Sequence, residues 1–224
     1  MPRPLSELIN TAEPAWPLVK QWVAEAKNGV EVLPPAQNAA EVLHQMQVTT
    51  RSPMGAIIYE TGGLLVDHGW IRILGSGHPR LPRSIVSWNL GRAFQKVGDP
   101  AGFLLIADDV IGGFYAIDGG ALGPKPGDVF YFAPDTLRWE SLDRNYSNFL
   151  QFCFNGDLNG YNATFRWPGW IDEISDLPGD RGIGIYPFPF TAEGKDITKC
   201  SRKHIPLSEL YGLYVEEFPR QLGS

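Results

Sequence analysis

The segment between residues 103 and 132 places the tightest limit on the fold of this chain. It holds three largely apolar runs, at residues 103–107, 113–118 and 129–132, and a fourth, more polar candidate strand follows at 138–142. Each run has the length of a strand, and the pairs Gly112-Gly113 and Gly119-Gly120 supply backbone that bends easily. No helical periodicity separates the runs, so hairpins are the favoured connections. We therefore expect an antiparallel sheet at the centre of the molecule.

Helical patterns flank this segment on both sides. Residues 15–27 repeat apolar side chains at three- and four-residue spacing, and Asn28-Gly29 gives a stop. After Pro53 the pattern changes to strands, with a hairpin of residues 63–66 and 70–74. Further helices are expected at residues 34–47, 81–90, 146–155, from Trp167 onward and at 206–218. An edge strand is expected at residues 183–190, where Pro187 and Pro189 cannot donate backbone hydrogen bonds. The predicted fold class is α+β, with a mostly antiparallel sheet of four to six strands packed by N-terminal and C-terminal helices.

The length of the chain suits one domain with a sizeable core. A chain of 224 residues buries roughly 70% of its unfolded surface, and no internal repeat or linker divides it. We expect a single domain over residues 1–224. Its parts are a helical region at 1–50, a sheet core at 55–145, and a helical and irregular region at 146–224.

Charge and composition remove several classes of partner. The net charge is −6 and no basic run exceeds two residues, which disfavours binding to nucleic acid. No apolar run reaches 18 residues, so a membrane is not an expected partner. Two cysteines cannot form the disulfide framework of a small secreted domain. The expected location is the cytoplasm.

The centre of the chain carries a resemblance to a known superfamily. The strings FLLIADDVIGGFYAID at residues 103–118, GDVFYFAPD at 127–135 and YSNFL at 146–150 resemble the SUKH superfamily. That superfamily has an α+β fold with one mostly antiparallel sheet, and many members are immunity proteins that bind and neutralise a toxin. The resemblance therefore implies a protein partner rather than catalysis. This chain departs from the pattern in its length, its extension after residue 155 and its aromatic N-terminal hairpin.

A second resemblance covers the whole chain. The strings LSELI at residues 5–9, GSGHPRLPR at 75–83 and RWPGW at 166–170 are similar to an uncharacterised bacterial family of unknown function. It implies no activity.

Adjacent carboxylates at Asp108 and Asp109 are the first candidates for chemistry. Such a pair could bind a metal or act as acid and base, because proximity raises one pKa. However, neighbouring residues of a strand point to opposite faces, so the two side chains diverge unless a turn brings them together. Asp is also common in turns after an apolar strand, where it accepts backbone hydrogen bonds. The turn interpretation is favoured.

The loop at residues 75–84 is the most distinctive stretch. His78, Arg80 and Arg83 give it hydrogen-bond donors that suit a carboxylate or phosphate. It does not match a P-loop, and the plainer interpretation pairs its arginines with surface acids. The four histidines of the chain are scattered and neither cysteine lies in a C-x-x-C motif, so we expect no metal site and no cofactor.

Three hypotheses for function follow. The first is a non-enzymatic protein-binding module, for which Trp70 and Arg72 on the predicted hairpin join the candidate residues. The second is a small-molecule-binding protein or a hydrolase-type enzyme with a pocket of His78, Arg80 and Asp108, which requires these groups to meet at one cavity. The third is a homodimer that buries an aromatic C-terminal region.

Overall fold

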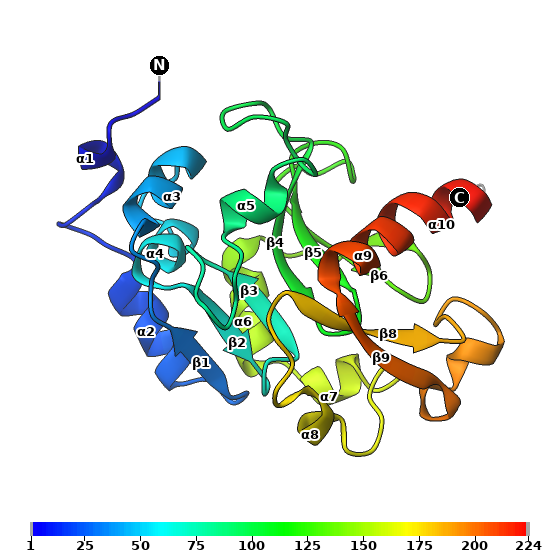
Figure 1. Cartoon of the computed structure of the whole chain (residues 1–224). Coiled ribbons are helices and arrows are strands. Elements are labelled where there is room, and N and C mark those ends of the chain that lie inside the picture. Colours follow the sequence, from blue (N-terminus) through cyan, green and yellow to red (C-terminus); the bar gives the residue numbers. More distant parts are fainter. Residues whose placement is uncertain (1, 223–224) are drawn as a thin grey trace.

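The computed structural model describes residues 2–222 and is built on one large antiparallel sheet (Figure 1). Its seven strands follow the order β1-β2-β3-β4-β5-β6-β7, so each pairs with its neighbours in the sequence. They are β1 (Val30–Leu33), β2 (Gly63–Val66), β3 (Ile71–Leu74), β4 (Phe103–Asp109), β5 (Phe114–Asp118), β6 (Val129–Ala133) and β7 (Arg138–Ser141). A separate two-stranded sheet contains β8 (Arg181–Tyr186) and β9 (Ser201–Pro206). The antiparallel α+β class is confirmed, but the prediction of four to six strands is wrong.

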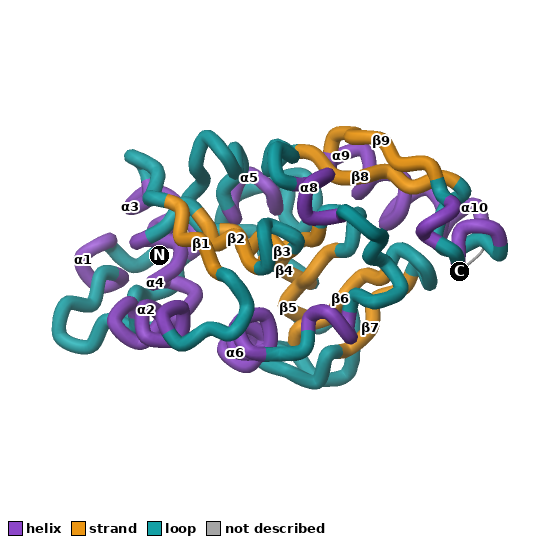
Figure 2. Tube along the Cα trace, turned by 90° about the horizontal axis from the view of Figure 1, so that it is seen from below, coloured by secondary structure: helices purple, strands orange, loops and turns teal. Residues whose placement is uncertain are grey.

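Helices and the small sheet cover the two faces of the main sheet. Figure 2 shows α2, α4 and α6 on one side, which we call the helical face, and α5, α8, α9 and the β8–β9 hairpin on the other, which we call the outer face. The α-helices are α1 (Leu5–Leu8), α2 (Trp16–Ala24), α3 (Ala39–Met46), α4 (Pro53–Glu60), α5 (Ile85–Asn89), α6 (Tyr146–Asn155), α7 (Leu158–Tyr161), α8 (Trp170–Ile174), α9 (Leu207–Tyr211) and α10 (Phe218–Leu222). Two 3-10 turns, η1 (Glu193–Lys195) and η2 (Ile197–Lys199), and a π-helix, η3 (Gly212–Glu217), complete the structure.

Tight turns set the register of the central strands. The β2–β3 turn consists of Asp67, His68 and Gly69, which all have positive φ (52°, 59° and 86°). The β4–β5 turn places Gly112 at φ 87°, a conformation that favours glycine. These two turns fix which side chains of β3 and β4 face each side of the sheet.

Several elements differ from the sequence prediction: the short helices α1 and α7 were not predicted, and three further differences bear on the architecture. Helix α4 lies at the start of the region expected to be strands, with Ser52 capping it by accepting a hydrogen bond from the Gly55 N–H at 3.1 Å. Strand β1 occupies a stretch of four residues that was not predicted as a strand. Strand β9 is a mostly exposed, polar strand that was also not predicted.

Apolar side chains from both faces form one continuous core. Its largest fully buried members include Trp70 and Phe114 from the sheet and Phe149 from α6. Within residues 2–222 every helix is too short or too polar to cross a bilayer.

Candidate functional site

Strand alternation separates Asp108 from Asp109. The two residues end β4, and both are 0% exposed. Asp108 pairs in register with Arg72 of β3 and points to the outer face, whereas Asp109 points to the helical face. The paired carboxylates therefore do not share a pocket.

On the outer face, Asp108 lies between two buried arginines. Its Oδ1 accepts a hydrogen bond from Arg72 Nε at 2.7 Å, and the Nη1 and Nη2 atoms of Arg83 donate to Oδ2 and Oδ1 at 2.5 and 3.0 Å. Arg72 is 2% exposed and Arg83 is 6% exposed. Two guanidinium groups thus share one carboxylate, so this cluster carries an excess positive charge inside the protein. We call Arg72, Asp108 and Arg83 the buried triad.

Backbone carbonyls of the C-terminal region close the buried triad. Arg83 Nε and Nη2 donate to the Gly179 carbonyl at 2.9 and 2.8 Å, and Arg72 Nη1 donates to the Arg181 carbonyl at 2.6 Å. Burial lowers the pKa of Arg83, and the neighbouring Asp108 partly offsets that effect. The triad therefore joins the main sheet to the segment that leads into β8.

On the helical face, Asp109 behaves as a turn residue. Its Oδ1 accepts hydrogen bonds from the Ile111 and Gly113 N–H groups at 3.0 and 2.8 Å, and Tyr131 Oη donates to its Oδ2 at 2.7 Å. Burial raises the pKa of Asp109 to about 6, against the opposing effect of these hydrogen bonds. The carboxylate holds the β4–β5 turn in shape.

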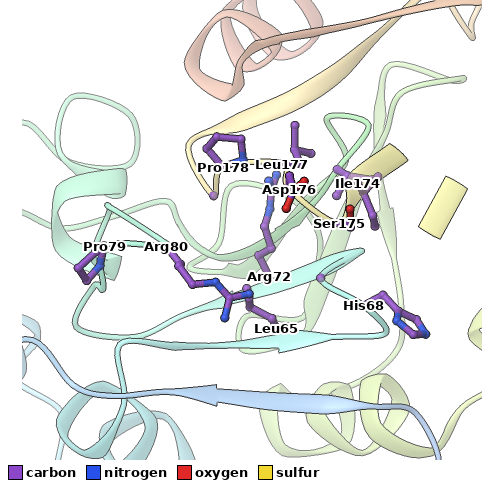
Figure 3. A pocket seen from close by; sticks show the side chains of 13 residues that line it. Leu65, His68, Arg72, Pro79, Arg80, Ile174, Ser175, Asp176, Leu177 and Pro178 are labelled. Atoms are coloured by element: carbon purple, nitrogen blue, oxygen red, sulfur yellow. The ribbon is translucent and has the colours of Figure 1, made fainter. Parts of the chain in front are cut away.

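A cavity of about 330 Å³ lies beside Arg72 on the outer face. Figure 3 shows Arg72 extending from β3 toward the segment of Asp176 and Leu177, with Arg80 and His68 on opposite sides. The accessible lining is more polar than apolar, and the apolar side chains in it are Leu65, Pro79, Val110, Ile174, Leu177 and Pro178. We call this the Arg72 cavity.

The Arg72 cavity opens into a shallower groove of about 440 Å³ along the edge of the sheet. The two share Leu65, His68, Gly69, Arg80 and Ser175. The groove is further lined by Gly29, Val30, Glu31 and Ile171. We call this second depression the edge groove.

Aromatic and cationic side chains hold the wall formed by α8. The Arg166 guanidinium lies 4.8 Å from the Trp70 ring and 4.2 Å from the Trp170 ring, and it also pairs with Asp67 in the β2–β3 turn. Trp167 Nε1 donates to Glu173 at 2.6 Å. These contacts fix the segment of α8 against the hairpin, so the cavity has a firm wall. Trp70 is 0% exposed, so it contributes to the site by packing against these side chains.

His78 and Arg80 do not join the buried triad. The Arg80 N–H donates to His78 Nδ1 at 3.1 Å, and the exposed Arg80 side chain pairs with Glu31 of β1. Arg80 lines the Arg72 cavity, whereas His78 and Arg83 line a different depression, of about 710 Å³. The catalytic set that sequence analysis considered is thus spread over separate places.

The cavity wall at residues 174–179 was not predicted from the sequence. Asp176, on that wall, forms no ion pair within residues 2–222. The only signal was the acidic and apolar composition of residues 171–177, which is also typical of an exposed helix end. Among residues 2–222, no group of three or more His, Cys, Asp or Glu side chains is placed to hold a metal ion.

Comparison with known proteins places the chain in a family. A family described as "Protein of unknown function DUF2625" matches residues 5–210. "Putative uncharacterized protein YbfG" of Escherichia coli (strain K12) is 46% identical over 210 residues, covering 93% of this chain and 94% of that protein. An "Uncharacterized protein" of Haemophilus influenzae is 42% identical over 184 residues, with 82% and 81% coverage. No solved structure matches. The chain belongs to the DUF2625 family.

Proposed function

We propose that this chain is a non-enzymatic protein-binding module of the immunity-protein type, with a core related to the SUKH superfamily. In this proposal the partner adds an extended segment to β1 and covers the edge groove. The observation that carries the proposal is the free edge of β1 directly beside that groove.

The register of β1 supports pairing with a partner strand. The Asp67 N–H donates to the Gly29 carbonyl at 2.7 Å, so alternate residues from Gly29 onward bond to β2. The N–H and C=O groups of Val30 and Val32 consequently point away from the sheet, and no backbone hydrogen bond within residues 2–222 joins that side of β1 to another segment. Such an edge accepts an added strand through main-chain hydrogen bonds.

The side chains around the groove favour a partner with apolar and basic groups. Ile171 lines the groove and is 41% exposed, and the residue after it, the exposed Asp172, forms no ion pair within residues 2–222. The net charge of −6 acts in the same direction over a longer range.

Two features make the hydrolase-type alternative weaker. Asp108 is fully buried and engaged by two arginines, so it has no access to a substrate. His78 lies in a depression separate from the Arg72 cavity. The homodimer through the C-terminal region stays a prediction, for which light scattering is the test.

The test is affinity capture from a lysate of the native cell with two matched variants. Val32→Pro removes the outward N–H of β1 without removing a bond to β2, whereas Val32→Thr keeps the N–H. We expect one discrete protein to be captured by the wild type and by Val32→Thr but lost with Val32→Pro. Circular dichroism and thermal melting establish that both variants fold. If every captured protein also binds Val32→Pro, pairing at the β1 edge is wrong.

A further inference from the structure

We propose that the Arg72 cavity is a binding site for a small zwitterion, an α-amino acid with an aliphatic side chain. This inference does not depend on the proposed function, because it concerns the deep cavity and not the β1 edge. Four features of the cavity carry it: its size, a free donor at its base, a free carboxylate at its rim and the apolar side chains in the wall between them.

The base of the cavity offers a buried donor. A guanidinium has five N–H groups. Arg72 Nε donates to Asp108 Oδ1, and Nη1 donates to the Arg181 carbonyl. Arg72 Nη2 donates to the Asp109 carbonyl at 3.1 Å and forms an ion pair with Asp108 Oδ1 at 2.7 Å. The second N–H of Nη1 has no acceptor within residues 2–222. This free donor belongs to a side chain that is 3% exposed and lines the cavity.

The buried triad makes that donor a site for negative charge. Its two guanidinium groups have one bonded carboxylate between them, and Asp180, the other acidic side chain that acts on Arg83, forms no ion pair with either arginine. A carboxylate entering the cavity would supply a second bonded carboxylate and accept the free N–H. Hydrogen bonds of this charge-assisted kind are among the stronger ones in proteins.

The rim of the cavity favours a positive group on the same ligand. Asp176 lines the cavity, is exposed and forms no ion pair within residues 2–222. Figure 3 shows Asp176 on the segment toward which Arg72 extends. A ligand with a carboxylate at Arg72 and an ammonium at Asp176 would give each of these two side chains a partner of opposite charge. A simple anion would leave Asp176 unpaired and close to another negative charge.

Size and wall chemistry select among zwitterions. A volume of about 330 Å³ lies at the lower end of the range for small-molecule sites, which is roughly 300–1,000 Å³. The side chains of Leu65, Val110 and Ile174 give the ligand an apolar surface to cover. An aliphatic amino acid such as leucine fits these requirements.

The experiment compares leucine with two analogues that each lack one charged group. Isocaproate keeps the carboxylate and isoamylamine keeps the ammonium. In calorimetric titrations of the full chain, we expect leucine to bind about ten- to a hundredfold more tightly than either analogue, the effect of one charge-assisted hydrogen bond. Leucine should also shift the side-chain NMR resonances of Arg72.

Two exposed carboxylates of the same segment provide matched variants. Asp176→Asn should lower the affinity for leucine to that for isocaproate, whereas Asp172→Asn, which does not line the cavity, should leave it unchanged. Equal binding of leucine and isocaproate by the wild type would reduce the cavity to an anion site and overturn the proposal. No detectable binding of leucine, or an unmoved Arg72 resonance, would overturn it as well. Capture of a protein at the β1 edge is measured separately, so the two proposals can fail independently.

Discussion

Substituting Asp108 by Asn tests how the buried triad contributes to stability. The asparagine has nearly the same size but no charge. It retains one acceptor oxygen, while its amide NH₂ must face N–H donors of Arg72 or Arg83. Both guanidinium groups then remain buried without a bonded carboxylate, and only the unbonded Asp180 still acts on Arg83.

The expected cost can be worked from this geometry. Removing one partner of a buried ion pair destabilises a protein by about 3–5 kcal/mol, and here one carboxylate serves two arginines. Such a loss is a large part of a typical unfolding free energy of about 5–15 kcal/mol. For a chain of this size it corresponds to a fall in melting temperature of roughly 10 °C.

The assay is urea unfolding followed by tryptophan fluorescence, with Asp172→Asn as the control. That exposed carboxylate forms no ion pair within residues 2–222, so its loss should leave the midpoint nearly unchanged. A second variant, Arg83→Met, removes the excess positive charge and leaves Arg72 paired with Asp108. It should cost less than Asp108→Asn. An Arg83→Met variant that is as unstable as Asp108→Asn, or more so, would refute the charge argument.

Three further predictions concern other contacts. The pKa of Asp109 is raised from 3.8 to about 6 in the folded state, so the folded protein holds this proton more tightly than the unfolded chain does. The free energy of unfolding should therefore be highest below pH ~4 and fall by about 3 kcal/mol as the pH rises to ~6. Unfolding titrations across that pH range should show this loss in the wild type but not in Asp109→Asn. Gly113→Ala places a Cβ 2.2 Å from Asp109 Oδ2 and should cost about 1–3 kcal/mol, whereas Gly29→Ala, with nothing within 4 Å, should cost far less by the same measurement. Arg166→Met loses the ion pair with Asp67 and two aromatic contacts, so it should cost about 2 kcal/mol and speed hydrogen exchange at residues 167–177.

The sequence patterns that predicted the fold correctly were those with a clear period or a clear boundary. Helix α6 and strand β4 have an apolar stripe and an apolar run that match their observed positions. Helix α4 was missed because residues 55–58 are all buried, so no polar face marks its period. Strand β9 was missed for the opposite reason, since its mostly exposed, polar side chains carry little apolar signal. Strand β1 is only four residues long.

The candidate site was predictable in part. Strand alternation predicted that Asp108 and Asp109 diverge unless a turn brings them together, and in the structure they point to opposite faces. The pairing of Arg72 with Arg83 at one carboxylate could not be predicted, because it depends on which strands lie beside each other. Asp176 joins Arg72 only through the packing of α8, which no local pattern describes.

The closure of the buried triad by Gly179 and Arg181 has a consequence for folding during synthesis. All seven strands of the main sheet precede residue 142 and pair with sequence neighbours, so the sheet can assemble as the chain leaves the ribosome. Arg72 and Arg83 still lack their carbonyl acceptors at that stage and remain hydrated. The two arginines gain these acceptors only when the last fifth of the chain has been added. A chain that stops before residue 179 would thus leave charged donors without acceptors on the outer face of its main sheet.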